Sequence, residues 1–425
     1  MTGDADRGGG ESVREADDSP KPLEGIRVLD FTWVYAGPHA TKHLAALGAD
    51  VVKVESKYKP DMMRYGYTYD EFEAGESPNV SAFYNEFNLG KRSLRLNLKR
   101  ERGRELALEL AAAADVWIEN FSPGFLRSID LGYESVRAVN PEIVSVSMPG
   151  WASSGPAAEY RAWGMNLEAM AGLDHLSGRP DDPPTPAGFS WPDPTAGVMA
   201  VFAILAALAS RESTGEGRRI EIPQFETTVS LLHGALATAD LTGESGERTG
   251  ARDEDRRFVQ GVYECRGEDD WLAVAVGTDA QWRTLCDVVG RPELATDSEL
   301  ATHAARLRNH DRFDEVVESW SRDTNAEEAR TTLQERGVPA GRVANERDLV
   351  EDDPQLRERT TFVERDHPEV GERTYTGFPS EFSAVDVTPP SRAPLFGEHT
   401  DDVLRDWLEM PDERIDRLQT DEILY

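Results

Sequence analysis

Short apolar runs alternate with helix-like segments along the first half of the chain. The run at residues 25–32 (GIRVLDFT) precedes residues 36–49 (AGPHATKHLAALGA), which place a proline near the start and a glycine near the end, as helices commonly do. The same alternation predicts further strands at 50–56, 93–98, 115–121 and 142–148, and a second helix at 100–114. Because these strands are apolar almost throughout, the pattern predicts a parallel sheet covered on both faces, in a Rossmann-like α/β domain.

The second half of the chain changes character. Residues 194–210 (PTAGVMAVFAILAALAS) are apolar on every helical face, which predicts a buried helix. Residues 216–257, which end in the charged stretch LTGESGERTGARDEDRR, are expected to form a linker. Beyond it, GVYECRG and WLAVAVG predict an antiparallel pair followed by acidic amphipathic helices, hence a smaller α+β domain over 258–345. Residues 346–425 are expected to return and complete the large α/β domain of residues 23–215.

Charge excludes several classes of partner. The chain holds 79 Asp and Glu against 46 Lys and Arg, a formal net charge of −33. Nucleic acid and anionic membranes are poor partners, because both attract positive charge. All seven lysines lie before residue 100, and the acid excess extends through both halves of the chain. This pattern indicates a halophilic protein that its charge keeps soluble in high salt. A binder of basic partners is the alternative, and it predicts one dense acidic block.

The remaining composition points to the cytoplasm. Residues 1–22 are acidic and glycine-rich, are expected to be a disordered tail, and lack the apolar core of a signal peptide. Cys265 and Cys286 have no metal-binding spacing and fit a reducing compartment. The longest apolar run, within residues 198–209, is too short to cross a bilayer. We therefore expect a cytoplasmic protein without a membrane span.

Several motifs for nucleotides, metals and hydrolysis are absent from the sequence. There is no GxxxxGK[ST] phosphate loop, no GxGxxG after the first strand, no HExxH and no GxSxG. The eight histidines are scattered, so no metal site is expected. What remains is carboxylate chemistry on a sheet of a kind that often binds phosphate-bearing ligands.

One carboxylate stands out in the stretch SWPDPTAG at residues 190–197. Pro194 presets the φ of a first helical residue, so Asp193 is expected at the N-cap, accepting from the N–H of Thr195 or Ala196. The local pattern leaves two interpretations open, a structural cap or a functional acid. Because the helix is apolar all round, its start is expected inside the molecule, where the dipole and N–H bonds keep the carboxylate ionised. An ionised, partly desolvated carboxylate can act as a nucleophile.

Five separated blocks occur in an order typical of one enzyme family. They are LEGIRVLDFTWVYAGPHATKHLAALGADVVKVE, FNLGKRSLRLNLKRERGRE, DVWIENFSPG, DPTAGVMAVFAILAAL and RAPLFGEHTDDVL. With these blocks the chain resembles the class III CoA-transferase family (formyl-CoA transferase and carnitine CoA-transferase-like) from Leu23 onward. The resemblance implies transfer of CoA from an acyl-CoA thioester to a free carboxylic acid. The CoA thioester is then a substrate, and no permanently bound cofactor is expected.

The resemblance also assigns roles to residues. Asp193, at the DPTAG position, is implied to be the nucleophile, passing through a mixed anhydride and an aspartyl-CoA thioester. Lys57 and Arg127 are taken as substitutes in the CoA site, because Ser56 and Ser128 stand where relatives commonly place arginines. The full set implied to bind CoA is Val34, Tyr35, Ala36, Lys57, Leu96, Asn97, Lys99, Asn120, Phe121, Ser122, Arg127, Arg161 and Trp163.

Ordinary structural interpretations stay open for these residues. Leu96 and Phe121 would also suit a core, Lys99 and Arg161 a solvated surface, and Trp163 simple packing. Gln260 and Gly261, in FVQGVYE, lie nearest to the position of a glycine-rich catalytic loop found in some relatives. They are the candidate oxyanion loop. CoA itself is expected against the carboxyl ends of the parallel strands.

The resemblance leaves more than one activity and more than one substrate open. Acyl-CoA racemases and epimerases share the fold but need a second acid–base group, usually a histidine in a GHD-like stretch, where this chain has Trp163 and Gly164. A non-catalytic CoA-binding protein is a third interpretation. By analogy, we expect succinyl-CoA as donor and a short dicarboxylate such as mesaconate or malate as acceptor, with Arg161 or Arg257 as candidates to pair with its distal carboxylate. The family also implies an interlocked homodimer.

Overall fold

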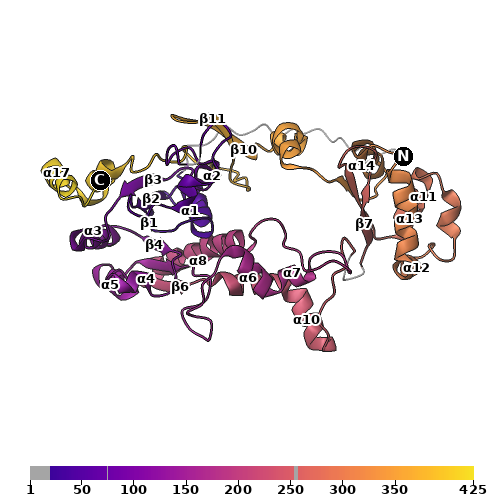
Figure 1. The fold of residues 1–425 in the computed structure, drawn as a ribbon, viewed down its shortest axis with the longest axis horizontal. Coiled ribbons are helices and arrows are strands. Elements are labelled where there is room, and N and C mark those ends of the chain that lie inside the picture. Colours follow the sequence, from indigo (N-terminus) through magenta and orange to yellow (C-terminus); the bar gives the residue numbers. More distant parts are fainter. Residues whose placement is uncertain (1–19, 74, 253–256) are drawn as a thin grey trace, which may run out of the picture. The chain divides into compact units, whose positions relative to one another are not determined.

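The computed structural model describes residues 20–73, 75–252 and 257–425. Most of the predicted tail, residues 1–19, lies outside the described residues. The chain divides into two compact units (Figure 1). Unit 1 holds the described residues up to Leu173, together with Ala187–Gly234 and Leu356–Tyr425. Unit 2 holds Asp174–Pro186 and Ala235–Gln355.

Unit 1 is built on a six-stranded sheet in the order β3-β2-β1-β4-β5-β6, with every neighbouring pair parallel. This is the strand order of a doubly wound Rossmann-like fold, so the predicted parallel α/β sheet is confirmed. The strands are β1 (Arg27–Asp30), β2 (Asp50–Glu55), β3 (Arg92–Arg95), β4 (Val116–Glu119), β5 (Val144–Ser147) and β6 (Arg218–Glu221). The sequence pattern did not predict β6, because this edge strand has no buried residue.

Two apolar clusters cover the two faces of this sheet. Alternate residues of a strand point to opposite faces, and in β1 Val28 joins one cluster while Leu29 joins the other. The cluster around Leu29 includes residues of α3 and α16, and the cluster around Val28 includes residues of α1 and α8. The strands are therefore buried on both sides, as their continuous apolar character predicts.

Helices, one short hairpin and two 3₁₀ turns, η1 and η2, complete the described part of unit 1 (Figure 1). Its helices are α1 (Ala36–Ala46), α2 (Ala82–Phe87), α3 (Glu101–Ala112), α4 (Phe125–Ser128), α5 (Tyr133–Val139), α6 (Gly164–Ala171), α8 (Pro192–Thr214), α9 (Gln224–Val229), α16 (Thr400–Leu408) and α17 (Asp412–Thr420). The 3₁₀ turn η1 spans Met62–Tyr65, and β10 (Phe362–His367) pairs with β11 (Gly371–Thr376). Three further helices cross the boundaries between the units along the chain: α7 (Leu173–Leu176), α10 (His233–Thr242) and α15 (Pro354–Glu358).

The long apolar helix forms, but the prediction that it is buried on every side is wrong for the single chain. In α8 the small residues of one face, among them Ala196, Gly197 and Ala200, are buried, whereas Val198 and Phe202 are 56% and 69% exposed. The reason is its place as a covering helix, with one face on the sheet layer and the other outward. Within the described residues, α8 is the one helix long and apolar enough to cross a membrane. This is weak evidence, because core helices of soluble proteins pass the same test.

The expected linker at residues 216–257 is not a simple connection. It contains β6, α9, the 3₁₀ turn η2 (Ser230–Leu232) and α10. Residues up to Gly234 belong to unit 1, where β6 adds the last parallel strand beside β5. Tertiary pairing with β5 explains this result, since the charged sequence of β6 carries no strand pattern of its own.

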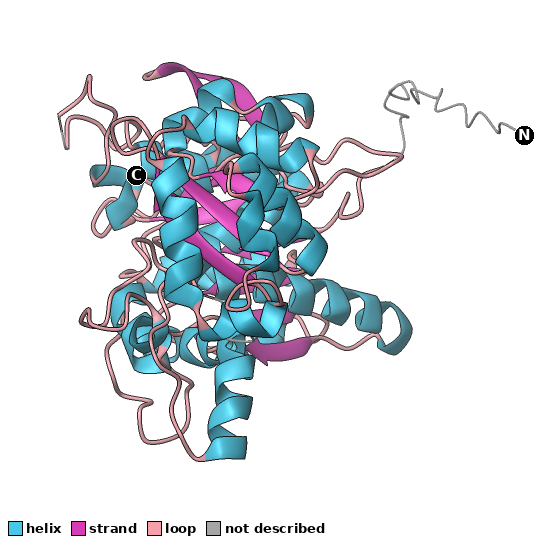
Figure 2. Cartoon of the chain, turned by 90° about the vertical axis from the view of Figure 1, so that its right-hand side faces the viewer, coloured by secondary structure: helices cyan, strands magenta, loops and turns pink. Residues whose placement is uncertain are grey.

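Unit 2 is a smaller α+β body. Helices predominate over strands in the chain as drawn in Figure 2. Its sheet has the order β7-β8-β9, and the predicted antiparallel pairing of β7 with β8 is confirmed. The strands are β7 (Val259–Glu264), β8 (Trp271–Val276) and β9 (Ala340–Arg342). The helices are α11 (Asp279–Val288), α12 (His303–Arg308), α13 (His310–Ser321) and α14 (Ala326–Glu335), with 3₁₀ turn η3 (Pro292–Thr296) and π-helical turn η4 (Asp348–Asp352).

Candidate active site at the carboxyl edge of the sheet

Most of the predicted site residues in unit 1 follow directly after a strand. Val34, Tyr35 and Ala36 come after β1, and Lys57 comes after β2. Leu96, Asn97 and Lys99 follow β3, and Asn120, Phe121 and Ser122 follow β4. Since β3, β2, β1 and β4 are neighbours and all parallel, these segments share one edge of the sheet. This is the edge at which open α/β sheets bind their ligands.

Asp193 meets this edge through α8. It is the second residue of the helix, not the N-cap, because the helix begins at Pro192 after Trp191. Its carboxylate does not accept from Thr195 or Ala196. Instead, Oδ1 accepts a hydrogen bond from the backbone N–H of Ala36 at 3.2 Å, and Oδ2 accepts one from the Ser190 hydroxyl. The predicted local cap is therefore wrong, since the donors are a preceding side chain and a segment 157 residues away.

Ala36 is the first residue of α1, so Asp193 accepts from the positive end of a second helix. The close packing of α1 on α8 makes this contact possible. A Cβ added at Gly197 would lie 2.9 Å from the carbonyl oxygen of Ala36 and 2.9 Å from Cδ2 of His39. The glycine of the DPTAG stretch thus allows the two helix starts to approach each other.

Burial dominates the electrostatics of Asp193. Burial raises the pKa of the Asp193 carboxyl above its ordinary value, and the hydrogen bonds from Ser190 and Ala36 act in the opposite direction. The sequence predicted that hydrogen bonds stabilise the ionised carboxylate, and such bonds are present. Desolvation has the larger effect on the pKa, however, so the net shift is upward. Burial and the charges of Asp193 and Glu86 also raise the pKa of Tyr35 to about 12, so its hydroxyl keeps its proton at neutral pH.

The sequence did not predict that two small residues, Ser190 and Gly164, contact Asp193. Ser190 lies three positions before Asp193 and donates to it. Gly164 packs against the same pair, since a Cβ at this position would lie 2.6 Å from Asp193 Oδ2 and closer still to Ser190 Oγ. The spacing of Ser190 could have suggested a local side-chain bond, whereas nothing in the sequence places Gly164 at Asp193.

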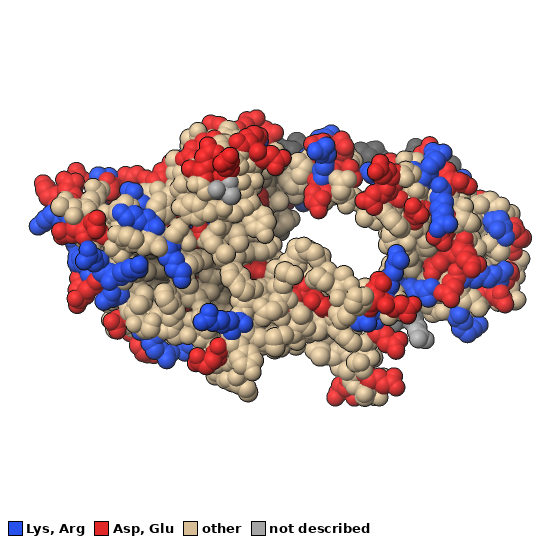
Figure 3. Space-filling view, in the orientation of Figure 1, with Lys and Arg blue, Asp and Glu red and all other residues tan. Residues whose placement is uncertain are grey.

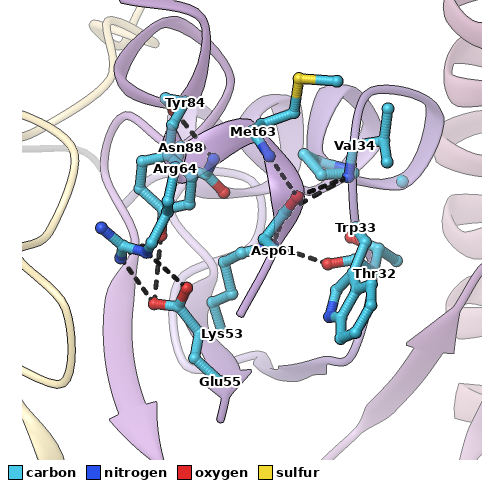
Figure 4. Close-up of polar contacts among 12 residues, drawn as sticks. Thr32, Trp33, Val34, Lys53, Glu55, Asp61, Met63, Arg64, Tyr84 and Asn88 are labelled. Atoms are coloured by element: carbon cyan, nitrogen blue, oxygen red, sulfur yellow. Dashed lines mark hydrogen bonds and ion pairs between the residues drawn. The ribbon is translucent and has the colours of Figure 1, made fainter. Parts of the chain in front are cut away.

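The loop between β1 and α1 is held by side chains from four segments. The N–H of Thr32 donates to Asp30 Oδ1 at 2.8 Å, and its carbonyl accepts from Lys53 Nζ at 2.6 Å. The Asn120 side chain accepts from the N–H of Trp33 and donates to its carbonyl, both at 2.8 Å. Asp61 accepts from the N–H of Val34 (Figure 4). The side-chain amide of Asn120 is thus bonded to this loop.

Three exposed lysines gather over aromatic rings at the same edge. Lys57 Nζ lies 4.4 Å from the ring centroid of Tyr425, Lys99 Nζ lies 5.1 Å from that of Tyr58, and Lys59 Nζ lies 5.4 Å from that of Trp33. None of the three forms an ion pair with a carboxylate of the described residues. In a chain of charge −33, these three lysines, without an ion-pair partner among the described residues, are available to attract anionic groups. The sequence analysis did not name Lys59 or Tyr425 among the candidate site residues.

Leu96 and Asn97 are buried. Leu96 belongs to the core under the sheet, and its carbonyl accepts a hydrogen bond from the Tyr425 hydroxyl at 3.3 Å. Asn97 is bonded to the C-terminal segment, donating from Nδ2 to the carbonyl of Glu422 at 3.0 Å. The Leu96 carbonyl and the Asn97 side chain therefore bind the segment after β3 to the C-terminal segment.

Phe121, Ser122 and Arg127 lie on the β4 side of the edge. The Phe121 ring packs edge-on against Trp33, with centroids 5.2 Å apart. Ser122 and Arg127 line a cavity of about 370 Å³ next to β4, β5 and β6. Glu119 also lines it, and burial raises the pKa of this carboxyl to about 7.

The remaining predicted residues do not follow directly after a strand of the parallel sheet. Arg161 and Trp163 are exposed just before α6, next to Gly164, and Arg161 has no ion pair among the described residues. Gln260 and Gly261 lie in unit 2, within β7, opposite Ala275 and Val274 of β8. They are regular strand residues and not a loop. Because they belong to unit 2 and Asp193 belongs to unit 1, their role at Asp193 stays a prediction.

Comparison with known proteins identifies the family to which this chain belongs. The model of CoA-transferase family III matches residues 23–400. The chain belongs to CoA-transferase family III. It is thus a CoA-transferase, and the resemblance seen in its five sequence blocks is confirmed.

Two relatives and one solved structure match this chain over nearly their whole length. The formyl-CoA:oxalate CoA-transferase of Streptomyces avermitilis is 35% identical over 95% of this chain and all of its own. The succinyl-CoA:mesaconate CoA-transferase of Haloarcula hispanica is 33% identical over 90% of this chain and 95% of its own. The crystal structure of a CAIB/BAIF family protein from Brucella suis superposes with a TM-score of 0.83, at 30% identity, covering 92% of this chain and all of that chain.

Proposed function

We propose that this CoA-transferase moves CoA between short dicarboxylic acids, with Asp193 as the covalent nucleophile. The observation that carries the proposal is the setting of Asp193: a partly exposed carboxylate at the ligand-binding edge, held by the Ala36 N–H and the Ser190 hydroxyl. Among the described residues it has no cationic partner. A carboxylate held by two hydrogen-bond donors and not by a salt bridge is oriented yet able to react.

The proposed reaction conserves the energy of the thioester at each step. The Asp193 carboxylate attacks the thioester carbonyl, the C–S bond breaks, and CoA leaves as a thiolate, forming a mixed anhydride. The thiolate then attacks the Asp193 carbonyl of the anhydride, giving an aspartyl-CoA thioester and releasing the first acid. The acceptor carboxylate repeats these two steps in reverse order. No ATP is required, which agrees with the absence of a phosphate loop in the sequence.

The CoA moiety is proposed to lie along the carboxyl edge of the sheet. The lysine cluster of Lys57, Lys59 and Lys99 supports this placement, because CoA carries phosphate groups and none of the three lysines forms an ion pair with a carboxylate of the described residues. Trp33, in the loop after β1, contacts Lys59 of the cluster and Phe121 of the segment after β4. Val34, Tyr35, Ala36, Asn120 and Phe121 would then bound the channel for the pantetheine arm.

The substrate class rests on the relatives. Apart from formyl-CoA, the acids in the names of the two relatives described above are oxalate, succinate and mesaconate, which are all dicarboxylates. We propose succinyl-CoA as donor and mesaconate or malate as acceptor. Arg161, exposed beside Gly164 and unpaired among the described residues, is the candidate to bind a distal carboxylate.

The site disfavours racemisation. Removing and returning a proton at one carbon needs a second base near Asp193. The residue of the 163–164 segment that packs on Asp193 is Gly164, which has no side chain and no room for one. Transfer therefore remains the favoured activity over a racemase or epimerase, and over a non-catalytic CoA-binding role.

We further propose a homodimer that acts in a high-salt cytoplasm. The outward stripe of α8, formed by Val198, Phe202 and Leu205, is apolar and 37–69% exposed in the single chain, and a second copy would cover it. Figure 3 shows few charged side chains over α6 and α8, whereas acidic side chains are scattered elsewhere over the visible face of both units. Such a spread favours adaptation to salt over a single basic partner.

A trapping experiment tests the proposed mechanism. The protein in molar KCl is mixed with succinyl-CoA and then treated with hydroxylamine or borohydride, and peptides are analysed by mass spectrometry. Modification at Asp193 that requires the thioester is expected, while Asp115, a carboxylate paired with Arg211 at the other edge of the sheet, stays unmodified. Bound CoA with an unmodified Asp193 would rule the mechanism out. A panel of CoA donors and acids, assayed in the same salt, identifies the substrates.

A further inference from the structure

The residue that leads into the active-site loop has an unusual backbone. Val34 has a φ of +67°, in the left-handed region that β-branched residues rarely adopt. No glycine occupies this position, although glycine would adopt such a φ at little cost. Something in the surrounding structure must therefore hold Val34 in this conformation.

The group that bonds to Val34 is the buried carboxylate of Asp61. Both of its oxygens lie 3.2 Å from the backbone N of Val34. Asp61 is 1% exposed, and its charge is balanced by Lys53, whose Nζ lies 3.3 Å from Oδ2. Its Oδ1 also accepts from the N–H of Met63 at 3.1 Å, at the start of η1 (Figure 4). The carboxylate is thus fixed from a second strand and from its own turn.

The position of Val34 decides where the next residues go. Asp30, Lys53 and Asn120 fix the main chain of Thr32 and Trp33, before the left-handed residue. After it come Tyr35 and Ala36, whose N–H donates to Asp193. Val34 is the residue at which the main chain turns between these two parts of the loop, and its N–H is bonded to Asp61.

We propose that Asp61 is a positioning residue for the transfer reaction: it holds Val34 in the left-handed conformation and thereby directs the Ala36 N–H at Asp193. This inference rests on the proposed role of Asp193 as nucleophile. Asp61 itself touches no substrate, because it lies beneath the loop and is buried.

The effect of replacing Asp61 by asparagine follows from its contacts. The amide has one acceptor where the carboxylate has two, so its NH₂ group must face Lys53 or one of the N–H donors of Val34 and Met63. In either orientation of the amide, the Val34 N–H keeps one of its two acceptors at 3.2 Å and loses the other, so the left-handed conformation is held less firmly and Val34 relaxes toward negative φ. The Ala36 N–H turns away, and Asp193 loses a hydrogen bond that lowers its pKa. The pKa of Asp193 should therefore rise further.

Four variants test the proposal: Asp61→Asn, Val34→Gly, the double variant, and Asp115→Asn as a matched control. Asp115 also accepts from a backbone N–H, that of Arg27 at 2.8 Å, and pairs with Arg211, but at the opposite edge of the sheet. Folding of each variant is checked by thermal unfolding. The first readout is the pH dependence of labelling of Asp193 by a water-soluble carbodiimide, which reacts with the protonated carboxyl. The second is kcat and KM on the donor and acid pair most active with the unmodified protein.

For Asp61→Asn we expect half-labelling of Asp193 at a higher pH, and a fall in kcat of about tenfold or more, with a smaller change in KM for the CoA thioester. Asp115→Asn should change neither readout. In the Val34→Gly background the Asp61→Asn change should have a smaller effect, because glycine adopts the left-handed conformation unaided. Identical labelling profiles for Asp61→Asn and the unmodified protein, or equal effects in both backgrounds, would overturn the inference. A shifted labelling profile in a protein that transfers no CoA would instead refute the proposed function and leave the positioning role standing.

Discussion

Gly164 packs directly against Asp193, with no space between them for a methyl group. A Cβ at residue 164 would lie 2.6 Å from Oδ2 of Asp193 and would overlap Ser190 Oγ, the donor to that same oxygen. The only residue type that leaves both side chains in place is glycine. The contact therefore makes the geometry of Asp193 sensitive to a residue that has no side chain.

Replacing Gly164 by alanine should displace Ser190 and Asp193 together. We expect kcat to fall about a hundredfold, since small displacements of reacting groups carry large kinetic costs, while the affinity for free CoA stays close to that of the unmodified protein. Steady-state kinetics and calorimetric titration with CoA measure the two effects. Gly234→Ala is the matched control, because nothing lies within 4 Å of a Cβ at that position. An unchanged kcat in Gly164→Ala would show that the contact is unimportant for transfer.

Asp193→Asn and Asp193→Ala should fold and bind CoA but lose transfer by at least about a thousandfold, because each removes the nucleophile. Asparagine keeps the size of the side chain and can still accept from the Ala36 N–H. Its failure to react would therefore separate nucleophilicity from packing. Near-normal turnover in both variants would contradict the assignment.

Activity should decline with acid at a pH above that expected for an ordinary aspartate. Burial raises the pKa of Asp193, and only the ionised carboxylate attacks, so kcat/KM is lost as the pH falls through this raised pKa. In Ser190→Ala a hydrogen bond that lowers the pKa is removed, and the acid limb should move further upward. Ser213→Ala, which removes a hydroxyl bonded to a helix carbonyl of α8 far from Asp193, should leave the profile unchanged. The pH dependence of kcat/KM distinguishes these outcomes.

Replacing Lys57 and Lys99 by glutamine should raise KM for the CoA thioester with little change in kcat. Hydrogen bonds to charged groups contribute about 1.5–3 kcal/mol each, so roughly a tenfold or larger rise is expected for each lysine that contacts a phosphate. The effect should shrink as salt is added. Lys21→Gln serves as the control, since Lys21 donates to the carbonyl of Thr388 and lies outside the lysine cluster. Equal KM values for all variants would remove the lysine cluster from the CoA site.

Phe202→Lys should yield a monomer if the outward stripe of α8 lies at a subunit contact. The side chain is 69% exposed in the single chain, so the change should scarcely affect folding of unit 1, whereas a buried charge at an interface is costly. Analytical ultracentrifugation in molar KCl measures the oligomeric state. A lysine at Glu212, in the exposed last turn of the same helix, is the control, and an unchanged sedimentation coefficient for Phe202→Lys would exclude the α8 stripe as the contact.

Much of the fold follows from periodicity along the chain. The run around Val28 and Leu29 is apolar at successive positions, which predicts a strand buried on both faces, and the structure has this arrangement. Strand β6 was missed because its pairing with β5 and not its own composition makes it a strand. The full burial predicted for α8 failed for a related reason. Composition does not record which side of an apolar helix is covered by the same chain.

The sequence by itself determined the parallel α/β sheet, the family and the identity of Asp193 as the notable acid, because these depend on local periodicity and on the order of short motifs along the chain. Only the tertiary structure decided how Asp193 is held. Its donor at Ala36 is 157 residues away, and the left-handed Val34 that leads to Ala36 is bonded to Asp61 from a third segment. Such contacts arise where helix starts and strand ends converge, and this convergence depends on the packing of whole elements on one another.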